Sequence, residues 1–399
     1  MSTQHKKIDP AAVEGDFFRV KDLLSSQERE TLERVRTFLA EKVEPTANEL
    51  WARAESPLHL MDAVRDLEIT GLPGDAPGVT GQSPLLKGLI SMEMARTDPS
   101  FATFYGVHNG LGMGSIRECG SAEQQERWLP QMVRWEKIGA FGLTEPLVGS
   151  GTAGGLLTTA RREGDTWVLN GEKKWIGNAT FADLVVIWAR DEADDQVKGF
   201  VVERGTPGFT ARKLEGKIAL RGVQNAHIVL ADVRVPEANR LQRAESFRDT
   251  ARVLKTTRGG VAWFAIGCSM GAYEAARAYA VEREQFGKPI ASFQLVQDLL
   301  SRMLANITAC QALAVRMAGL QADGTLNDAQ AALAKMFCTT RMRETVAWAR
   351  EVFGANGILL EHKAARFFAD AEALYSYEGT RDMNSLIVGR AATGISAFV

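Results

Sequence analysis

Glu378 lies in a segment whose residue types suit proton abstraction. It occurs in Tyr377-Glu378-Gly379-Thr380, after Leu374 and Tyr375. A carboxylate in an aromatic, poorly hydrated pocket has a raised pKa, which suits a general base that works near neutral pH. For an arbitrary glutamate, a solvated position at a helix end is the more common arrangement. The segment alone leaves both interpretations open.

A second segment combines a guanidinium with an aromatic ring. Arg283 and Phe286 precede Gly287 and Pro289 at the expected end of a helix. Arginine and an aromatic side chain can together hold a phosphate and a flat ring. The same residues also form an ordinary basic helix end that glycine and proline terminate.

Residues 149–154 read Gly-Ser-Gly-Thr-Ala-Gly and match the G-x-G-x-x-G pattern of dinucleotide-binding folds. In a dinucleotide-binding fold this pattern leads into a helix, whereas the residues that follow it here predict a β-hairpin. We therefore expect a loop that lines a ligand. The chain has no Walker lysine, H-E-x-x-H motif or serine elbow, and its cysteines (119, 268, 310 and 338) are too scattered for a zinc site, so we expect buried, reduced thiols.

The elements that would position these residues follow the order helices, strands, helices. Residues 23–134 have helical periodicity, with capping-box patterns at Ser25 and Ser121. Residues 138–235 form short β-type runs, with turn pairs expected at 164–165 and 170–171. Helical periodicity returns from about residue 250, where glycines 259, 260, 267 and 271 predict close approach by a neighbouring backbone. We expect domains at residues 1–136, 137–245 and 246–399.

Composition restricts the class of protein. The chain has 399 residues, with 47 Lys and Arg against 49 Asp and Glu, so its formal charge is −2. No overall field would draw it to nucleic acid or to an anionic membrane. Residues 1–20 lack the apolar core of a secretory signal, and no run approaches the ~18 apolar residues of a membrane span. We expect a cytoplasmic protein with neither nucleic acid nor membrane as a partner.

Five segments together resemble the acyl-CoA dehydrogenase and oxidase family over residues 24–398. They are Phe141 to Pro146 (Phe-Gly-Leu-Thr-Glu-Pro), Trp175-Ile176-Gly177-Asn178, residues 283–290, Phe353 to Gly357 and Tyr377 to Thr380, in the family's order and spacing. Within the family the sequence most resembles glutaryl-CoA dehydrogenases and plant peroxisomal short-chain acyl-CoA oxidases. The oxidases share the Trp-Ile-Gly-Asn segment and Thr180 to Leu184.

The resemblance implies a mostly α fold with a central β-barrel domain: an α-helical domain, an antiparallel β-barrel and a four-helix bundle. It implies FAD, shared across the interface of an obligate oligomer that is usually a tetramer. The residues implied to line the FAD of their own subunit are Phe141, Leu143, Thr144, Gly149, Ser150, Trp175, Ile176, Gly177, Thr380 and Asp382. Those implied to reach a neighbouring subunit's FAD are Arg283, Phe286, Gln294, Glu351 and Gly354. Substrate contacts are implied for Ser150, Arg258, Gly379 and Ala102.

The chemistry implied by the resemblance is α,β-dehydrogenation of an acyl-CoA. Glu378 falls on the catalytic base, which takes the α-proton while the β-hydrogen leaves as hydride to flavin N5. The backbone N–H of Glu378 and a flavin hydroxyl would polarise the thioester carbonyl. The product would be a trans-2-enoyl-CoA, and the electrons would pass to an electron-transfer flavoprotein or to O₂.

Three positions depart from the family pattern. Ala102 stands where glutaryl-CoA dehydrogenases have an arginine for the distal carboxylate, and an unpaired buried carboxylate costs about 3–5 kcal/mol. Gly151 replaces the usual Asp of the flavin loop, and Gly177 replaces a Thr, which predicts either a gap beside flavin N5 or a tight turn. We therefore predict a short or branched acyl-CoA as substrate. The alternatives are a short-chain acyl-CoA oxidase, a glutaryl-CoA dehydrogenase and a non-catalytic CoA-binding scaffold.

Overall fold

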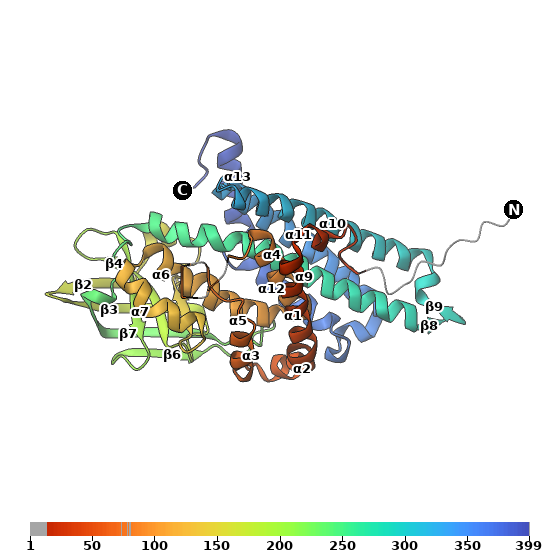
Figure 1. The fold of residues 1–399 in the computed structure, drawn as a ribbon, viewed down its shortest axis with the longest axis horizontal. Helices are drawn as coiled ribbons and strands as arrows, with labels where there is room; N and C mark the ends of the chain where they lie inside the picture. The colour runs from red at the N-terminus through yellow and green to blue at the C-terminus, as the bar shows by residue number, and fades with distance from the viewer. Residues whose placement is uncertain (1–13, 73, 78, 80, 399) are drawn as a thin grey trace.

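The computed structural model describes residues 14–398 except 73, 78 and 80. The expectation about a secretory signal therefore falls mostly on residues 1–13, which lie outside the described part. Within it, a helical region, a β-sheet region and a second helical region follow one another along the chain. Figure 1 shows the large sheet at one end of the molecule and the small β8/β9 hairpin at the other, with the long helix α9 (Phe247–Glu282) running between them.

The N-terminal region packs helices around a shared apolar core. Its elements are η2 (Val20–Leu23), α1 (Ser26–Phe38), η3 (Leu39–Val43), α2 (Glu44–Arg53), η4 (Leu58–Leu60), α3 (Met61–Asp66), α4 (Pro84–Thr97), α5 (Pro99–Gly106), η5 (Val107–Gly112), α6 (Met113–Cys119) and α7 (Ala122–Val133). Both predicted capping boxes are confirmed, at Ser25 with Glu28 and at Ser121 with Gln124. In each box the serine hydroxyl accepts the backbone N–H of the third helical residue, and the side chain of that residue accepts the backbone N–H of the serine.

The middle region is a curled seven-stranded sheet in the order β1-β4-β2-β3-β7-β6, with β5 paired to β4. Its elements are β1 (Gly139–Gly142), α8 (Thr152–Gly155), β2 (Thr159–Glu163), β3 (Thr166–Gly177), β4 (Leu184–Asp191), β5 (Val197–Glu203), β6 (Phe209–Lys213), β7 (Asn225–Pro236) and η6 (Glu237–Asn239). Most pairs are antiparallel, as the barrel prediction requires, but β1 and β2 each pair with β4 in parallel. The predicted turn at residues 164–165 joins β2 to β3.

The turn predicted at Asn170-Gly171 is wrong. Strand β3 continues through this pair, and its register with β7 shifts between Leu169 and Gly171 as in a β-bulge. Gly171 has φ 140°, and a Cβ on it would lie 2.6 Å from the Cα of Thr158. Glycine is therefore needed here because another backbone segment passes close by within the sheet. The same Asn-Gly pair is also typical of a turn, which explains the wrong prediction.

The C-terminal region is a helical bundle built on α9. It continues with β8 (Glu284–Gln285), β9 (Lys288–Pro289), η7 (Ile290–Ser292), α10 (Gln294–Ala322), α11 (Asp328–Val352), η8 (Gly354–Ile358), η9 (Leu360–His362), α12 (Ala364–Ser376) and α13 (Arg381–Thr393). A Cβ on Gly267 or Gly271 would collide with backbone carbonyls of α4, so the close approach predicted there is confirmed. The prediction is wrong at the other two glycines, because Gly259 meets the side chain of Met317 rather than a backbone and Gly260 has no neighbour within 4 Å.

Helix α10 is an exception to the expectation about apolar segments. It is the one helix in the described residues that is long and apolar enough to cross a membrane by length and composition. It contacts α11, α9 and α4, and it buries Met303, Ile307 and Ala314 in the bundle. The same composition is required of a core helix in a helical bundle.

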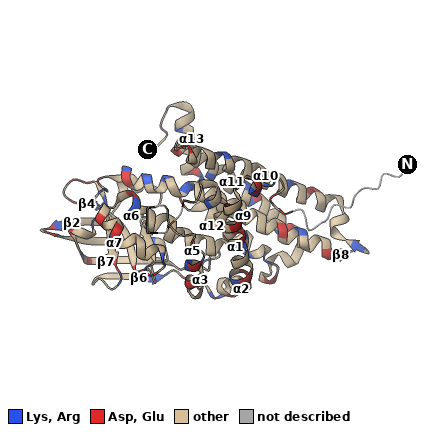
Figure 2. Cartoon of the chain, in the orientation of Figure 1, with Lys and Arg blue, Asp and Glu red and all other residues tan. Residues whose placement is uncertain are grey.

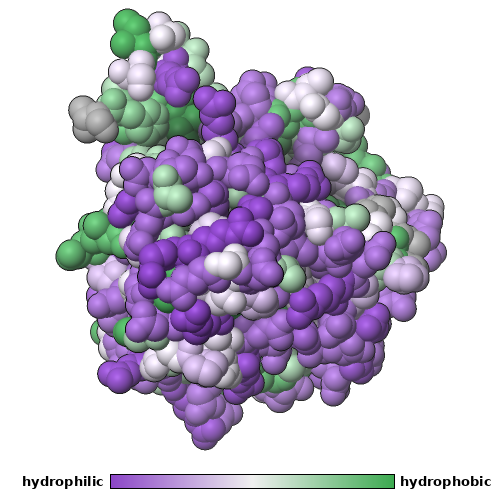
Figure 3. Space-filling view, turned by 90° about the vertical axis from the view of Figure 1, so that its left-hand side faces the viewer, coloured by the Kyte–Doolittle hydropathy of each residue, from purple (hydrophilic) through white to green (hydrophobic). Residues whose placement is uncertain are grey.

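The surface carries charges of both signs, interspersed along the chain (Figure 2). The face at the end of the large sheet is mostly hydrophilic, and hydrophobic residues gather where the C-terminal segment projects (Figure 3). Ile395 and Phe398 are the large exposed hydrophobic residues of that segment.

All four cysteines are unbonded and buried, which confirms the prediction for them.

Candidate active site

Glu378 lies in a short left-handed connection between α12 and α13. Helix α12 ends at Ser376, and Glu378 and Gly379 have φ values of 59° and 81°. Thr380 then caps α13, because its Oγ1 accepts a hydrogen bond from the backbone N–H of Met383 at 3.2 Å. A left-handed conformation costs about 1–3 kcal/mol for a residue other than glycine and persists where the surroundings enforce it.

The Glu378 carboxyl group is half-buried and has one direct side-chain donor. Thr257, on α9, donates its hydroxyl proton to Oε1 of Glu378. Burial raises the pKa of Glu378, while the Thr257 hydrogen bond and the charges of Arg258 and Lys335 act in the opposite direction without cancelling it. The resulting direction is the one that a general base needs near neutral pH.

The π-helical segment η5 packs both beside Thr257, the partner of this carboxyl group, and beside the end of strand β3. A Cβ placed on Gly110 would lie 3.4 Å from Cγ2 of Thr257, so η5 passes directly beside the hydrogen-bond partner of Glu378. At its other end, Cγ2 of Val107 lies 3.1 Å from the position of a Cβ on Gly177. Thr257, which holds the Glu378 carboxyl group, and the last residue of β3 therefore flank the same short helix, and π-helical segments often occur at functional sites.

The expectation of a gap at Gly177 is wrong. Val107 and, at 3.6 Å, Val223 occupy the space into which a side chain would extend. The tight-turn explanation does not hold either, since the φ of Gly177 is not in the left-handed region. Glycine occurs here because the valine of η5 packs against the strand backbone.

His108 attaches η5 to the sheet. Its Nδ1 accepts the backbone N–H of Gly139 at 2.9 Å, and its Nε2 lies 3.0 Å from the carbonyl oxygen of Met132, so Nε2 carries the proton. Burial lowers the pKa of His108 to about 4, so the ring is neutral at physiological pH. A Cβ on Gly112 would lie 3.0 Å from the Cα of Gly139, which brings the backbones of η5 and β1 into contact.

The loop after β1 is held by a buried ion pair. Nζ of Lys173 lies 2.8 Å from Oε1 of Glu145 and donates to the carbonyl of Leu143 at 3.0 Å. Glu145 in turn accepts the backbone N–H groups of Leu157 and Thr158 at 2.7 and 2.9 Å. Burial lowers the pKa of Lys173 to about 8, although Glu145 partly opposes this change. The pair fixes both ends of the glycine-rich loop, residues 149–154.

The G-x-G-x-x-G segment forms a loop with one short helix. Helix α8 has four residues and is followed by β2, so the dinucleotide-fold context is missing, as predicted. In the described part of the chain, the backbone N–H groups of Gly149, Ser150 and Gly151 donate no hydrogen bond to a protein acceptor. Side chains added at Gly149 or Gly154 would meet nothing within 4 Å.

These features fit a phosphate-bearing flat cofactor such as FAD. Consecutive unpaired N–H groups in a glycine-rich loop can bind an anion. The Trp175 side chain is 56% exposed on a left-handed residue (φ 67°) of β3, while its neighbours Ile176 and Gly177 are buried. An exposed indole at a fixed position offers a surface on which a ring system can pack.

The predicted residues form separate groups in the fold. Phe141 and Leu143 are buried in the core between the sheet and helices α6, α7 and α9. The carbonyl of Thr144 accepts the N–H of Lys174 at 2.8 Å, and Ser150 is exposed on the loop. Thr380 and Asp382 begin α13 beside Glu378 and Gly379.

A distal group lies at the far end of the molecule, where β8 and β9 are seen in Figure 1. It contains Arg283, Phe286, Gln294, Glu351 and Gly354, all of which are exposed. Tyr279, near the end of α9, contacts Phe353 with ring centroids 4.3 Å apart and ring planes tilted by 31°, and this contact places residues 351–354 at the same end. Within one chain the structure does not bring this group to the glycine-rich loop.

Two of the four predicted substrate residues, Arg258 and Ala102, lie within packed surroundings. Arg258 forms an ion pair with Asp328 at the start of α11, and its Nε is buried without a partner in the described residues. Ala102 is fully buried on α5. The hydroxyl of its neighbour Thr103 lies 3.4 Å from that of Tyr377, the residue that precedes Glu378.

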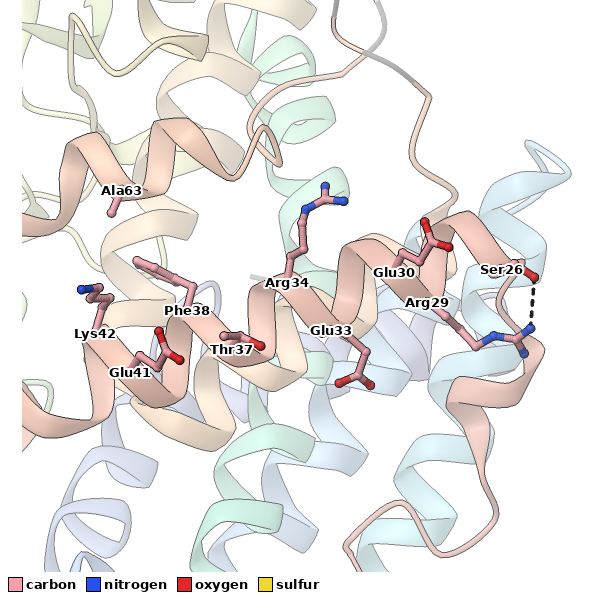
Figure 4. A pocket seen from close by; sticks show the side chains of 10 residues that line it. All are labelled: Ser26, Arg29, Glu30, Glu33, Arg34, Thr37, Phe38, Glu41, Lys42 and Ala63. Atoms are coloured by element: carbon pink, nitrogen blue, oxygen red, sulfur yellow. Dashed lines mark hydrogen bonds between the residues drawn. The ribbon is translucent and has the colours of Figure 1, made fainter.

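An open groove of about 930 Å³ lies along α1, apart from these residues (Figure 4). Charged side chains of both signs line it, among them Arg29, Glu33, Arg34 and Glu41. In the described residues none of the side chains that line this groove forms a hydrogen bond with Glu378 or with the glycine-rich loop, so we place the candidate site at Glu378.

Sequence reasoning missed Thr257, Lys173 and Lys335. Two of them had a signal close by. Thr257 directly precedes the predicted Arg258, and Lys173 pairs with Glu145, which belongs to one of the five segments. Lys335 lies within an apolar helix face and has no signal that separates it from a surface lysine.

Three family models match nearly the whole chain in order. They describe the N-terminal, middle and C-terminal domains of acyl-CoA dehydrogenases and match residues 25–136, 140–233 and 247–393. The chain belongs to the acyl-CoA dehydrogenase family, whose members are FAD-dependent oxidoreductases that act on CH–CH bonds.

Individual relatives agree with this assignment. The probable acyl-CoA dehydrogenase YngJ of Bacillus subtilis is 31% identical over 373 residues, which cover 92% of this chain and 98% of the relative. A glutaryl-CoA dehydrogenase from Mycobacterium smegmatis in complex with FADH2 is 34% identical with a TM-score of 0.92, and the match covers 96% of this chain and 98% of that one. The butyryl-CoA dehydrogenase of Megasphaera elsdenii is 31% identical with a TM-score of 0.88, covering 92% and 98%.

Proposed function

We propose that the protein dehydrogenates a short or branched acyl-CoA to the trans-2-enoyl-CoA, with Glu378 as the general base. The observation that carries this proposal is the half-buried Glu378 carboxyl group, held by Thr257 on a left-handed connection beside η5. Segment η5 also packs against Gly177 at the end of β3, and the exposed Trp175 and the glycine-rich loop fit a flavin.

FAD, when bound, supplies the acceptor for the β-hydrogen as hydride. The chain's own residues perform the proton chemistry. Glu378 takes the α-proton, and the Thr257 hydroxyl holds Oε1 so that the carboxyl group stays in one orientation. The backbone N–H of Glu378 has no protein acceptor in the described residues, so it is free to donate to the thioester carbonyl oxygen and to stabilise the charge that develops there.

The surroundings of Ala102 support a substrate without a distal carboxylate. Beside Ala102 the hydroxyls of Thr103 and Tyr377 are uncharged, and the guanidinium of Arg366 is already paired at 2.8 Å with Asp98, at the start of α5. Glutaryl-CoA remains the second candidate, because a glutaryl-CoA dehydrogenase is among the structural neighbours. The two candidates differ in whether a buried carboxylate finds a positive partner.

We also propose that the protein is a homo-oligomer, of tetramer size as the resemblance implies. Phe286 and Leu295, at the far end of the bundle, are 92% and 81% exposed. Apolar side chains this exposed are typical of a surface that another chain covers. The distal group of Arg283 and its neighbours would then meet the FAD of an adjacent subunit.

For the electron acceptor, we favour an electron-transfer flavoprotein over O₂. The hypothesis of oxygen access depended on a gap at Gly177, and Val107 fills that space.

The test is an anaerobic flavin-bleaching screen of the purified holoprotein with butyryl-, isobutyryl-, longer straight-chain and glutaryl-CoA, followed by readmission of air. Bleaching by a short or branched acyl-CoA, without rapid return of the yellow colour in air, is the expected result. Rapid reoxidation with peroxide would identify an oxidase, and CO₂ release from glutaryl-CoA would identify the second candidate. If no acyl-CoA bleaches the flavin, the protein is a CoA-binding scaffold and the proposal is wrong.

A further inference from the structure

Lys335 is a fully buried lysine that none of the recognised segments contains. It lies on α11 with 0% of its surface exposed. A buried ammonium group is costly unless hydrogen bonds and charges compensate for the water it has lost. Its contacts therefore indicate what the position requires.

The ammonium group of Lys335 binds the backbone on both sides of Glu378. Nζ donates to the carbonyl oxygens of Tyr375 and Gly379, each at 2.8 Å. The first carbonyl belongs to the last turn of α12, and the second follows the left-handed pair 378–379. The two hydrogen bonds span the connection and fix the distance between its ends.

A second side chain holds the same connection without a charge. Nδ2 of Asn384, on α13, donates to the carbonyl oxygens of Gly379 and Thr380, each at 2.9 Å. The carbonyl of Gly379 thus accepts from both Lys335 and Asn384. This neutral partner offers a natural comparison for the contribution of the lysine's charge.

The charged groups that act on Lys335 are few. In the described residues it forms no direct ion pair, and Glu378 is the carboxylate that acts on it most strongly. Arg258 is the nearby cation, and it is paired with Asp328 on the same helix as Lys335. Burial lowers the pKa of Lys335 to about 8, which Glu378 partly opposes.

We propose that Lys335 is a positioning residue for the base. Its two hydrogen bonds hold Glu378 in the left-handed conformation that aims both the carboxyl group and the backbone N–H at the substrate. Its positive charge also favours the ionised form of Glu378, the form that can accept a proton. The inference rests on the proposed function, in which Glu378 is the base.

The test compares Lys335→Met with Asn384→Ala in the holoprotein, using the best acyl-CoA from the bleaching screen. Stopped-flow measurement of flavin reduction across pH 5–9 gives a rate and the apparent pKa of its acidic limb. Lys335→Met is expected to lower the limiting reduction rate about tenfold or more, with a smaller change in KM, and to move the acidic limb to higher pH. Asn384→Ala is expected to lower the rate without moving that limb, since it removes hydrogen bonds but no charge.

Lys335→Gln, which keeps N–H donors but not the charge, provides a second variant. It should recover part of the rate while the acidic limb stays at the higher pH. FAD content and the melting temperature of each variant report whether it is folded. If Lys335→Met reduces at the parent rate with an unchanged limb, Lys335 supports the fold alone and the proposal is wrong. If neither lysine variant retains FAD, the ammonium is required for folding and the proposal is again wrong. A Glu378→Gln variant that stays active would instead overturn the proposed function.

Discussion

Replacing Asp370 with asparagine is expected to change how the stability of the protein depends on pH. Asp370, on α12, is fully buried where the three regions of the chain meet. Its Oδ1 accepts from Nε1 of Trp51 at 2.8 Å and from the backbone N–H of Leu220 at 2.6 Å, and its Oδ2 lies 3.5 Å from Oγ of Ser100. Burial, assisted by the charge of Asp98, raises its pKa to about 7, while the Trp51 hydrogen bond and Arg366 act in the opposite direction.

The magnitude follows from the difference between the two states. A change from 3.8 to about 7 is roughly three pKa units, or about 4 kcal/mol at 1.36 kcal/mol per unit. Because the folded state favours the protonated acid, this contribution is complete below about pH 4 and is lost as the pH rises through about 7. Between pH 5 and pH 8.5 the free energy of unfolding of the parent should fall by about 3 kcal/mol relative to that of a variant with a neutral side chain at this position.

Asparagine retains an acceptor oxygen for Trp51 and Leu220 and cannot ionise. Thermal unfolding of the parent and of Asp370→Asn is measured at pH 5, 7 and 8.5 with FAD present. The Tm of the variant minus the Tm of the parent should increase by several degrees as the pH rises. About 1 kcal/mol corresponds to ~2 °C or less in a chain of this size. A Tm difference for Asp370→Asn that stays constant or shrinks with rising pH would refute the reasoning.

Three further predictions concern the site. The enzyme should prefer butyryl-type or branched acyl-CoA to glutaryl-CoA by more than tenfold in kcat/KM, about 1.4 kcal/mol, because the hydroxyls beside Ala102 are uncharged and Arg366 is already paired with Asp98. Equal turnover of glutaryl-CoA would contradict this. Gly177→Thr should lower stability by about 1–3 kcal/mol through its contact with Val107, and Val107→Ala should restore part of it, as thermal unfolding can show. Lys173→Met should weaken FAD retention at least tenfold, or about 1.4 kcal/mol, since it leaves Glu145 buried without its partner. Unchanged FAD content after gel filtration would mean that the loop does not depend on this pair.

The order of the regions could be predicted from sequence because it depends on local patterns. Capping boxes at Ser25 and Ser121 and the hairpin turn at residues 164–165 involve residues close together in the chain, and each is confirmed. Asn170-Gly171 has the composition of a turn, yet Gly171 serves a close contact with Thr158 that only the folded sheet creates. The parallel pairing of β1 and β2 with β4 likewise depends on contacts between distant segments.

The candidate site divides in the same way. Glu378, Trp175 and the glycine-rich loop have recognisable local sequences. Lys173 and Lys335 acquire their roles from burial against backbone carbonyls, and the sequence does not distinguish a buried lysine from an exposed one. The packing of Val107 against Gly177 joins residues 70 positions apart, so the glycine alone predicted a gap or a turn where the structure has a contact.

The most direct test of the proposed function is the rate of anaerobic flavin reduction in Glu378→Gln, measured with the acyl-CoA that bleaches the parent best. The variant keeps the shape of the side chain and the Thr257 contact, so it should bind FAD and the enoyl-CoA product normally. Reduction should slow by at least about 10², since a general base contributes about 10²–10⁴. Reduction at the parent rate would contradict the account, because another residue would then be removing the α-proton.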